Sequence, residues 1–184
     1  MKGKLIAMTL LTVPLVGFVV TTRIPLEPTS TVWVEGGSTV RGWKCTAKTI
    51  DAQLTGDPAA SVAQLVTGAT VVIPVEQLDC GNGKMNEHMR KALQADKNPN
   101  LAFSLDSYEV SGTTATLKGS LEIAGTTRAI EIPATISEQG KEVRVKASKQ
   151  INMKEWGVKP PSLMLGTMKV KEVVTLGIDV GVKR

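Results

Sequence analysis

The stretch that decides the fold is residues 114–137, which read TATLKGSLEIAGTTRAIEIPATIS. Apolar side chains recur in it at even spacing: Leu117, Leu121 and Ile123, then Ile130, Ile132, Ala134 and Ile136. Lys118 and Glu122 fall on the opposite parity. Because successive side chains of a β-strand point to opposite faces, this spacing predicts two strands with one apolar face each. The short connection Gly125-Thr126-Thr127 predicts that the two strands pair as an antiparallel hairpin.

The same alternation continues along most of the chain. It predicts further strands over residues 31–35, 39–46, 48–55, 69–77, 101–108, 142–149 and 168–182, with a turn at Gly36-Gly37 between the first two. Val, Ile, Leu and Thr are plentiful, and branched side chains suit a pleated, half-buried surface. Strands that each carry one apolar face can close as a two-sheet sandwich or as a barrel. Periodicity alone does not choose between the two.

One segment has a helical period instead. Residues 85–95 read MNEHMRKALQA, and the apolar members of one helical face are Met85, Met89, Ala92 and Leu93. The turn signal Asn82-Gly83 precedes this segment, and Asn98-Pro99-Asn100 ends it. The sequence therefore predicts one short helix in an otherwise β protein.

The amino-terminal residues 1–22, MKGKLIAMTLLTVPLVGFVVTT, have the pattern of an export leader. Lys2 and Lys4 precede an apolar run that is short for a membrane-spanning helix of roughly 20 residues. The cleavage motif is weak, so a cleaved signal peptide and an uncleaved anchor, which would associate the protein with a membrane, both fit. A linker over 23–30 and a folded domain over 31–184 are expected to follow. Either alternative predicts a periplasmic or otherwise extracytoplasmic location.

Cys45 and Cys80 are the two cysteines of the chain. In an exported protein an even cysteine count favours a disulfide, and two separate buried thiols are the alternative. A bridge would close a loop of about 36 residues and stabilise the fold by at most about 3.8 kcal/mol in the chain-entropy treatment.

Several functional classes are disfavoured by composition. His88 is the single histidine and no C-x-x-C occurs, so neither a metal site nor a cofactor is expected. The formal net charge is +5, but no basic stripe interleaved with aromatics predicts nucleic-acid binding. No G-x-S-x-G or other paired catalytic motif is present, so we do not expect an enzyme.

Three segments in register carry a resemblance to a known family. NEHMRKAL at 86–93, followed by NPNLAF at 98–103, is similar to a short helix with D-x-H-L, then a proline and a strand reading I-x-F. LKGSLEIAGTTR at 117–128 is similar to G-x-L-T-I-x-G-V-T-R, and INMKEWGV at 151–158 to I-x-R-x-D-F-G-I. These are elements of the YceI-like, polyisoprenoid-binding family, which the chain resembles over roughly residues 30–182.

The departures from that family pattern concern its polar positions. Asn86 stands where the family usually has Asp, and Met153 where it usually has Arg, with Lys154 beside it. Glu155 and Trp156 are conservative replacements for Asp and Phe. Since the usual Arg could anchor a polar head group, its replacement leaves the head of the ligand open.

The resemblance implies an all-β, antiparallel, lipocalin-like β-barrel of about eight strands with one short helix. It also implies an elongated apolar cavity for an isoprenoid lipid or a quinone-like ligand. The expected lining residues are Trp33, Trp43, Phe103, Leu105, Leu121, Ile132, Met153, Trp156, Leu163, Met164 and Met168. The expected head-group contacts are His88, Arg128 and Lys154.

A structural interpretation stands beside each of these roles. Large apolar side chains can simply fill the core, and His88 and Arg128 can serve in hydrogen bonds or ion pairs. A barrel filled in this way would be an envelope structural or stress protein without a ligand. The loop over 159–166, KPPSLMLG, fits either a lid at the barrel end or an ordinary connection. A homodimer also stays open.

Overall fold

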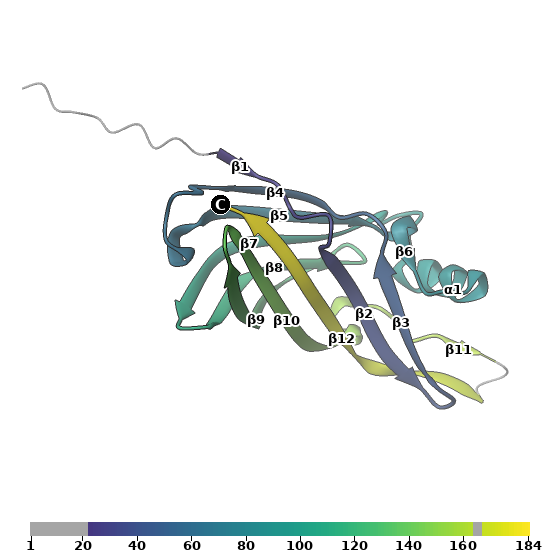
Figure 1. The fold of residues 1–184 in the computed structure, drawn as a ribbon. Helices are drawn as coiled ribbons and strands as arrows, with labels where there is room; N and C mark the ends of the chain where they lie inside the picture. The colour runs from purple at the N-terminus through teal and green to yellow at the C-terminus, as the bar shows by residue number, and fades with distance from the viewer. Residues whose placement is uncertain (1–21, 164–166) are drawn as a thin grey trace, which may run out of the picture.

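Twelve strands join into one sheet in the computed structural model of the chain, which describes residues 22–163 and 167–184 (Figure 1). Eleven of them follow one path, β1-β4-β5-β7-β8-β9-β10-β12-β2-β3-β6, and β11 pairs with β12 beside it. The strands are β1 Thr22–Ile24, β2 Thr31–Ser38, β3 Gly42–Ala47, β4 Asp51–Gly56, β5 Val66–Pro74, β6 Leu78–Asp79, β7 Asn100–Ser111, β8 Thr114–Ile123, β9 Thr126–Gln139, β10 Glu142–Asn152, β11 Ser162–Leu163 and β12 Met168–Lys183. The helices are α1 Gly83–Leu93 and the 3-10 turns η1 Val62–Gln64, η2 Val75–Gln77 and η3 Met153–Trp156.

The predicted hairpin at the centre of the sequence is confirmed. β8 and β9 pair antiparallel from Thr114 with Thr135 to Ile123 with Thr126. Ala124 and Gly125 both have positive φ, 49° and 75°, as the tight turn of a two-residue hairpin requires. Along β9 the buried residues Ile130, Ile132 and Ala134 alternate with exposed ones, which is the predicted pattern.

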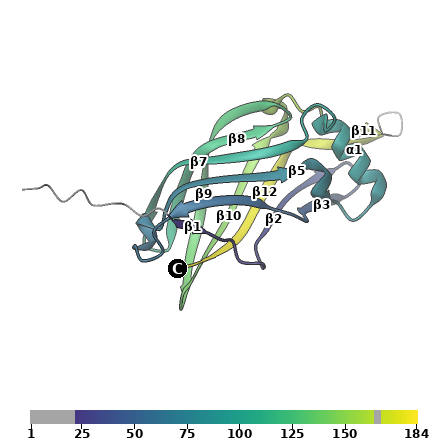
Figure 2. The same cartoon turned by 90° about the horizontal axis from the view of Figure 1, so that it is seen from above.

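Long antiparallel ladders make the sheet continuous and force it to curl. β10 and β12 pair from Glu142 with Lys183 to Asn152 with Val173. Bulges interrupt the β7–β8 pairing and the β12–β2 pairing, and bulges increase the local twist. The sheet bends around its apolar face, with α1 and β11 at one end and the carboxyl terminus toward the other (Figure 2). Among the described residues the path of pairing ends at β1 and β6, so it is a curled sheet rather than a ring closed by hydrogen bonds.

The prediction of about eight strands was wrong. The short strands β1, β6 and β11 contain only two or three residues each, and so few residues cannot show a repeating period. The turn predicted at Gly36-Gly37 was also misplaced, because both glycines continue β2 and pair with β3. The chain instead reverses over residues 38–41, where Ser38 N–H donates to Arg41 O at 2.9 Å.

The segment that follows the predicted leader packs on the sheet rather than acting only as a linker. β1 pairs with β4, and the side chain of Ile24 is 3% exposed. Leu26 forms an isolated bridge with Val182. Residues 1–21 of the predicted leader lie outside the described residues. In the described part of the chain, no helix has the length and apolar character needed to cross a membrane.

Two inward-facing aromatic rings rest on glycines of the neighbouring strand. The indole of Trp43 lies over Gly36, its partner across the β2–β3 ladder. The ring of Phe103 lies over Gly119 of β8, where a Cβ would overlap the carbonyl oxygen of Ser104 and lie 2.8 Å from Phe103 Cε2. These glycines let large rings lie flat along the inner face of the sheet.

The variant Gly119→Ala tests this packing. The added methyl group has no room, so we expect the free energy of unfolding to fall by about 1–3 kcal/mol, the usual cost of overpacking. Denaturant unfolding followed by circular dichroism measures the change. Gly42→Ala is the control, because a Cβ there lies at an ordinary 3.7 Å from Gly36 O, and it should change stability by less than about 0.5 kcal/mol. Equal stability of the two variants would contradict the account.

Candidate functional site

The curled sheet encloses two adjoining cavities. The helix-side cavity has a volume of about 570 Å³ and is bordered by α1, by the β2–β3 hairpin and by Met153, Pro161 and Met168. The inner cavity has a volume of about 240 Å³ and is bordered by the inward faces of β5, β7, β8, β9, β10 and β12. Small-molecule sites usually measure 300–1,000 Å³ and are mostly apolar. The helix-side cavity falls within this range without the inner cavity added to it.

The two cavities share part of their walls. The residues that border both are Val34, Leu78, Leu101, Ile123 and Leu176. All five side chains are apolar, so the boundary between the cavities offers no polar group to an entering chain. The two cavities therefore adjoin along an apolar wall, one on the side of α1 and the other on the inward face of the sheet.

Helix α1 supplies one wall of the helix-side cavity. Asn82 caps its first turn, where the side-chain oxygen accepts from Lys84 N–H at 3.0 Å and from Met85 N–H at 3.2 Å. Gln94 ends the helix in the left-handed conformation. The predicted apolar face is confirmed as the face turned inward, because its members all border the cavity: Met85, Met89, Ala92 and Leu93. Unbranched Met side chains adapt easily to guests of different shape.

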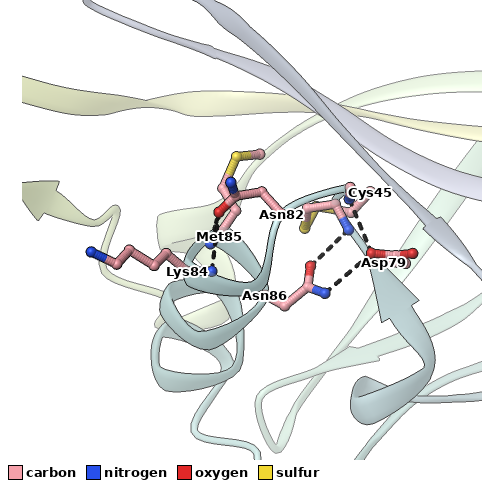
Figure 3. The surroundings of a disulfide bond; sticks show 8 residues. Cys45, Asp79, Asn82, Lys84, Met85 and Asn86 are labelled. Carbon is pink, nitrogen blue, oxygen red and sulfur yellow. Dashed lines mark hydrogen bonds between the residues drawn. A yellow bond between two sulfur atoms is a disulfide. The ribbon is translucent and has the colours of Figure 1, made fainter.

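A disulfide holds the start of this helix against the sheet (Figure 3). Cys45 of β3 is bonded to Cys80, which follows β6 directly, so the predicted disulfide is present. Both cysteines border the helix-side cavity. The Asn86 side chain adds a second tie, since its Oδ1 accepts from Cys80 N–H at 2.8 Å and its Nδ2 donates to Asp79 Oδ1 at 3.1 Å.

The carboxylate of Asp79 accepts the hydrogen bond that the Asn86 side chain donates. The amide of Asn86, the N–H of Gly81 and the ammonium of Lys48 lower the pKa of Asp79 from its usual 3.8 to about 2. A lowered pKa means that the charged carboxylate stabilises the folded state. That stabilisation is fully present above pH 3.8 and is lost as the pH falls toward 2. The contacts also explain why Asn suits position 86, since an Asp there could not donate to Asp79.

Polar groups are unevenly distributed between the two cavities. In the inner cavity the hydroxyl of Tyr108 is already satisfied, because it donates to Val62 O at 2.9 Å and accepts from Val66 N–H at 3.2 Å. The helix-side cavity is bordered by the basic side chains Arg41, Lys84 and His88 and, among the described residues, by no carboxylate.

Most of the residues predicted to line a cavity do border one. In the inner cavity these are Trp33, Phe103, Leu105, Leu121 and Ile132, and in the helix-side cavity Trp43, Met153 and Met168. Trp33 is a partial exception. The alternation of β2 places its indole on the face of the sheet opposite to Val32 and Val34. On that face Lys44 Nζ lies 4.2 Å from the centre of the Trp33 ring system.

Trp156 borders neither cavity and belongs to the packed core. Its side chain is 3% exposed, and its Nε1 donates to Leu121 O at 3.0 Å. The ring therefore packs in the core with Ile123 and Ile130 and joins η3 to the backbone of β8. Leu163 lies in β11, where its backbone pairs with Met168. Met164, with the rest of the predicted lid over 164–166, lies outside the described residues.

The three predicted head-group contacts do not lie together. His88 borders the helix-side cavity. Arg128 and Lys154 border neither cavity and are held by carboxylates elsewhere. Arg128 donates to Glu155 O at 3.1 Å and faces the Glu155 side chain, and Lys154 pairs with Glu172.

Sequence reasoning missed Arg41 and Lys84 as cavity residues. Lys84 is one turn before His88 on the helix, and this i, i+4 spacing was a signal that could have been read. Arg41 had no such signal, because the hairpin turn was placed at Gly36-Gly37. Within residues 22–163 and 167–184, no group of three or more His, Cys, Asp or Glu side chains is arranged to hold a metal ion.

The variant Asn86→Asp tests the tie between the helix and the sheet. A second carboxylate beside Asp79 removes a donor and adds repulsion, so we expect a lower unfolding midpoint at pH 7 and a higher pKa of Asp79 than the present value of about 2. Carboxyl chemical shifts measured by NMR during an acid titration report that pKa.

Asn82→Asp is the matched control for this substitution. The side-chain oxygen at position 82 only accepts hydrogen bonds, and a carboxylate there can accept the same two. Stability should therefore hold or rise slightly in Asn82→Asp. If the two variants unfold at the same midpoint, Asn86 does not act through Asp79.

Comparisons with known proteins agree with this architecture. The crystal structure of Burkholderia cenocepacia BcnA has 19% sequence identity and a TM-score of 0.69, covering 83% of this chain and 95% of that one. A Campylobacter jejuni YceI protein has 19% identity and a TM-score of 0.63, covering 75% and 82%. A polyisoprenoid-binding domain from Saccharophagus degradans has 10% identity and a TM-score of 0.64, covering 88% and 97%.

At these identities the structural likeness establishes the shared fold. No curated protein sequence matches the chain closely enough to count as a relative. The sequence profile of the YceI-like domain matches residues 26–182, which is nearly the whole of the folded part. The chain belongs to the YceI-like family.

Proposed function

We propose that this protein is an exported lipid-binding protein that holds an isoprenoid or similar long-chain amphiphile in its two adjoining cavities. The observation that carries the proposal is the pair of adjoining, mostly apolar cavities of about 570 and 240 Å³, which share five apolar wall residues. The Saccharophagus degradans domain of similar fold, described as polyisoprenoid-binding, supports the same class of ligand. The protein would act by binding its ligand rather than by catalysing a reaction.

Burial of the ligand supplies the driving force. An apolar chain that hides on the order of 500 Å² gains about 12 kcal/mol gross, at roughly 25 cal/mol for each Å². The loss of translation and the ordering of a flexible chain remove much of this gain. Only the remainder appears as affinity. A chain that passed the shared apolar boundary would bury more of its length and so bind more tightly.

Two observations support an extracytoplasmic site of action. The Cys45–Cys80 disulfide is of the kind that persists in oxidising compartments. The leader pattern of residues 1–22 points to export, either as a cleaved signal peptide or as a membrane anchor.

The second candidate is an envelope structural or stress protein whose barrel is filled by its own side chains. It requires an interior with no space beyond a few waters. The cavity volumes favour the lipid-binding proposal over this alternative.

The variant Leu101→Trp tests whether one chain occupies both cavities. Leu101 lies at their shared boundary, so an indole there should obstruct passage between them. We expect the variant to keep a ligand with a ten-carbon tail and to lose at least about tenfold in affinity for a twenty-carbon tail, equivalent to about 1.4 kcal/mol. Native mass spectrometry and fluorescence titration measure both affinities.

Val173→Trp is the control, because Val173 is 48% exposed and borders neither cavity. It should bind both tails as the original protein does. Circular dichroism establishes that each variant is folded. If the original protein takes up no isoprenoid of either length, and none accompanies it from the cell envelope, the filled-barrel alternative gains the advantage.

A further inference from the structure

Among the described residues, the charged ones that border the helix-side cavity are all basic, and they stand beside the neutral polar residues Ser38 and Asn82. Lys84 and His88 are one turn apart on α1 and border the cavity together with its apolar residues. Arg41 comes from the turn between β2 and β3, at the same end of the molecule (Figure 1). No Asp or Glu of the described residues borders this cavity.

The turn that presents Arg41 is well defined. Its Ser38 hydroxyl accepts from Arg41 N–H at 3.0 Å and donates to Arg41 O at 2.9 Å. Ser38 also borders the cavity. The backbone that carries the guanidinium is therefore fixed beside the cavity, while its long side chain keeps its freedom to reach a guest.

In the described part of the chain, the three basic residues that border the cavity have no carboxylate partner, unlike the other basic residues of α1. Farther along α1, Arg90 pairs with Glu76 at 3.0 Å and Lys91 pairs with Glu87 at 2.6 Å. Across residues 22–163 and 167–184, by contrast, the side chains of Arg41, Lys84 and His88 take part in no ion pair. Two permanent cations beside an apolar cavity leave a positive potential that an anion would neutralise.

We infer that the ligand is an anionic amphiphile, with a phosphate or carboxylate head held by Arg41 and Lys84 and its apolar tail directed into the inner cavity. This inference rests on the proposed lipid-binding function and specifies its ligand. The boundary that the two cavities share is apolar. A charged head buried there would lack a partner, so it is stable only at the α1 end. Neutral heads, including those of quinone-like molecules, can accept a hydrogen bond from these cations but gain less from them than an anion does.

The test uses three probes with the same twenty-carbon tail: geranylgeranyl phosphate, geranylgeranoate and geranylgeraniol. We expect the anionic probes to bind at least about tenfold more tightly than the neutral alcohol, as charge-assisted hydrogen bonds predict. Preference for the phosphate alone identifies a phosphate head, and equal preference for both anions identifies charge as the criterion. Equal affinity of all three probes overturns the inference while leaving lipid binding intact.

The double variant Arg41→Gln/Lys84→Gln tests whether these two residues hold the anionic head. It should lose about tenfold or more in affinity for the anionic probes and keep its affinity for geranylgeraniol. The control is Lys97→Gln/Lys141→Gln, which removes the same charge from residues that border neither cavity. An equal loss in the control would assign the effect to overall charge and overturn the inference. If none of the three probes binds the original protein, the lipid-binding proposal itself fails.

Discussion

The whole molecule depends on one constraint: a continuous antiparallel ladder has to remove a single apolar face from water. The backbone hydrogen bonds of β8, β9, β10 and β12 fix the strands side by side, and their twist makes the sheet curl toward that face. A long curled sheet can enclose more volume than its inward side chains fill, and two cavities remain on the apolar side of this one. The hollow is thus a consequence of how the strands pair and of which residues face inward.

Helix α1, rather than a further strand, lies across one end of the curled sheet. α1 is short, and it is held by its cap at Asn82, by the disulfide and by the contacts of Asn86 with Cys80 and Asp79. The same helix presents Met85 and Met89 to the cavity and Lys84 at its polar edge. One element therefore closes the sheet and provides both the apolar and the cationic surface against which a guest would lie.

Much of this architecture could be predicted from the sequence, since strict period-two spacing identified the long strands and the helical spacing identified α1. The all-β class followed from those patterns, the disulfide from the even cysteine count in a chain with an export leader, and the family from the three segments that resemble its motifs. The short strands β1, β6 and β11 could not be predicted, because two or three residues carry no period. The residues around the cavities were predicted less completely, since Arg41 and Lys84 come to border one cavity only when the hairpin and the helix are placed in space. Trp156 was assigned to the lining because size and hydrophobicity do not distinguish a core ring from a cavity wall.

The central claim is that the hollow inside the sheet accepts a long apolar chain. A crystal structure of the protein with geranylgeranyl phosphate tests it most directly. The account predicts continuous ligand density that begins beside Arg41 and Lys84, passes Leu101 and ends among Phe103, Leu121 and Ile132. Density for protein side chains throughout that space, with the lipid bound on the outer surface or not at all, would contradict it.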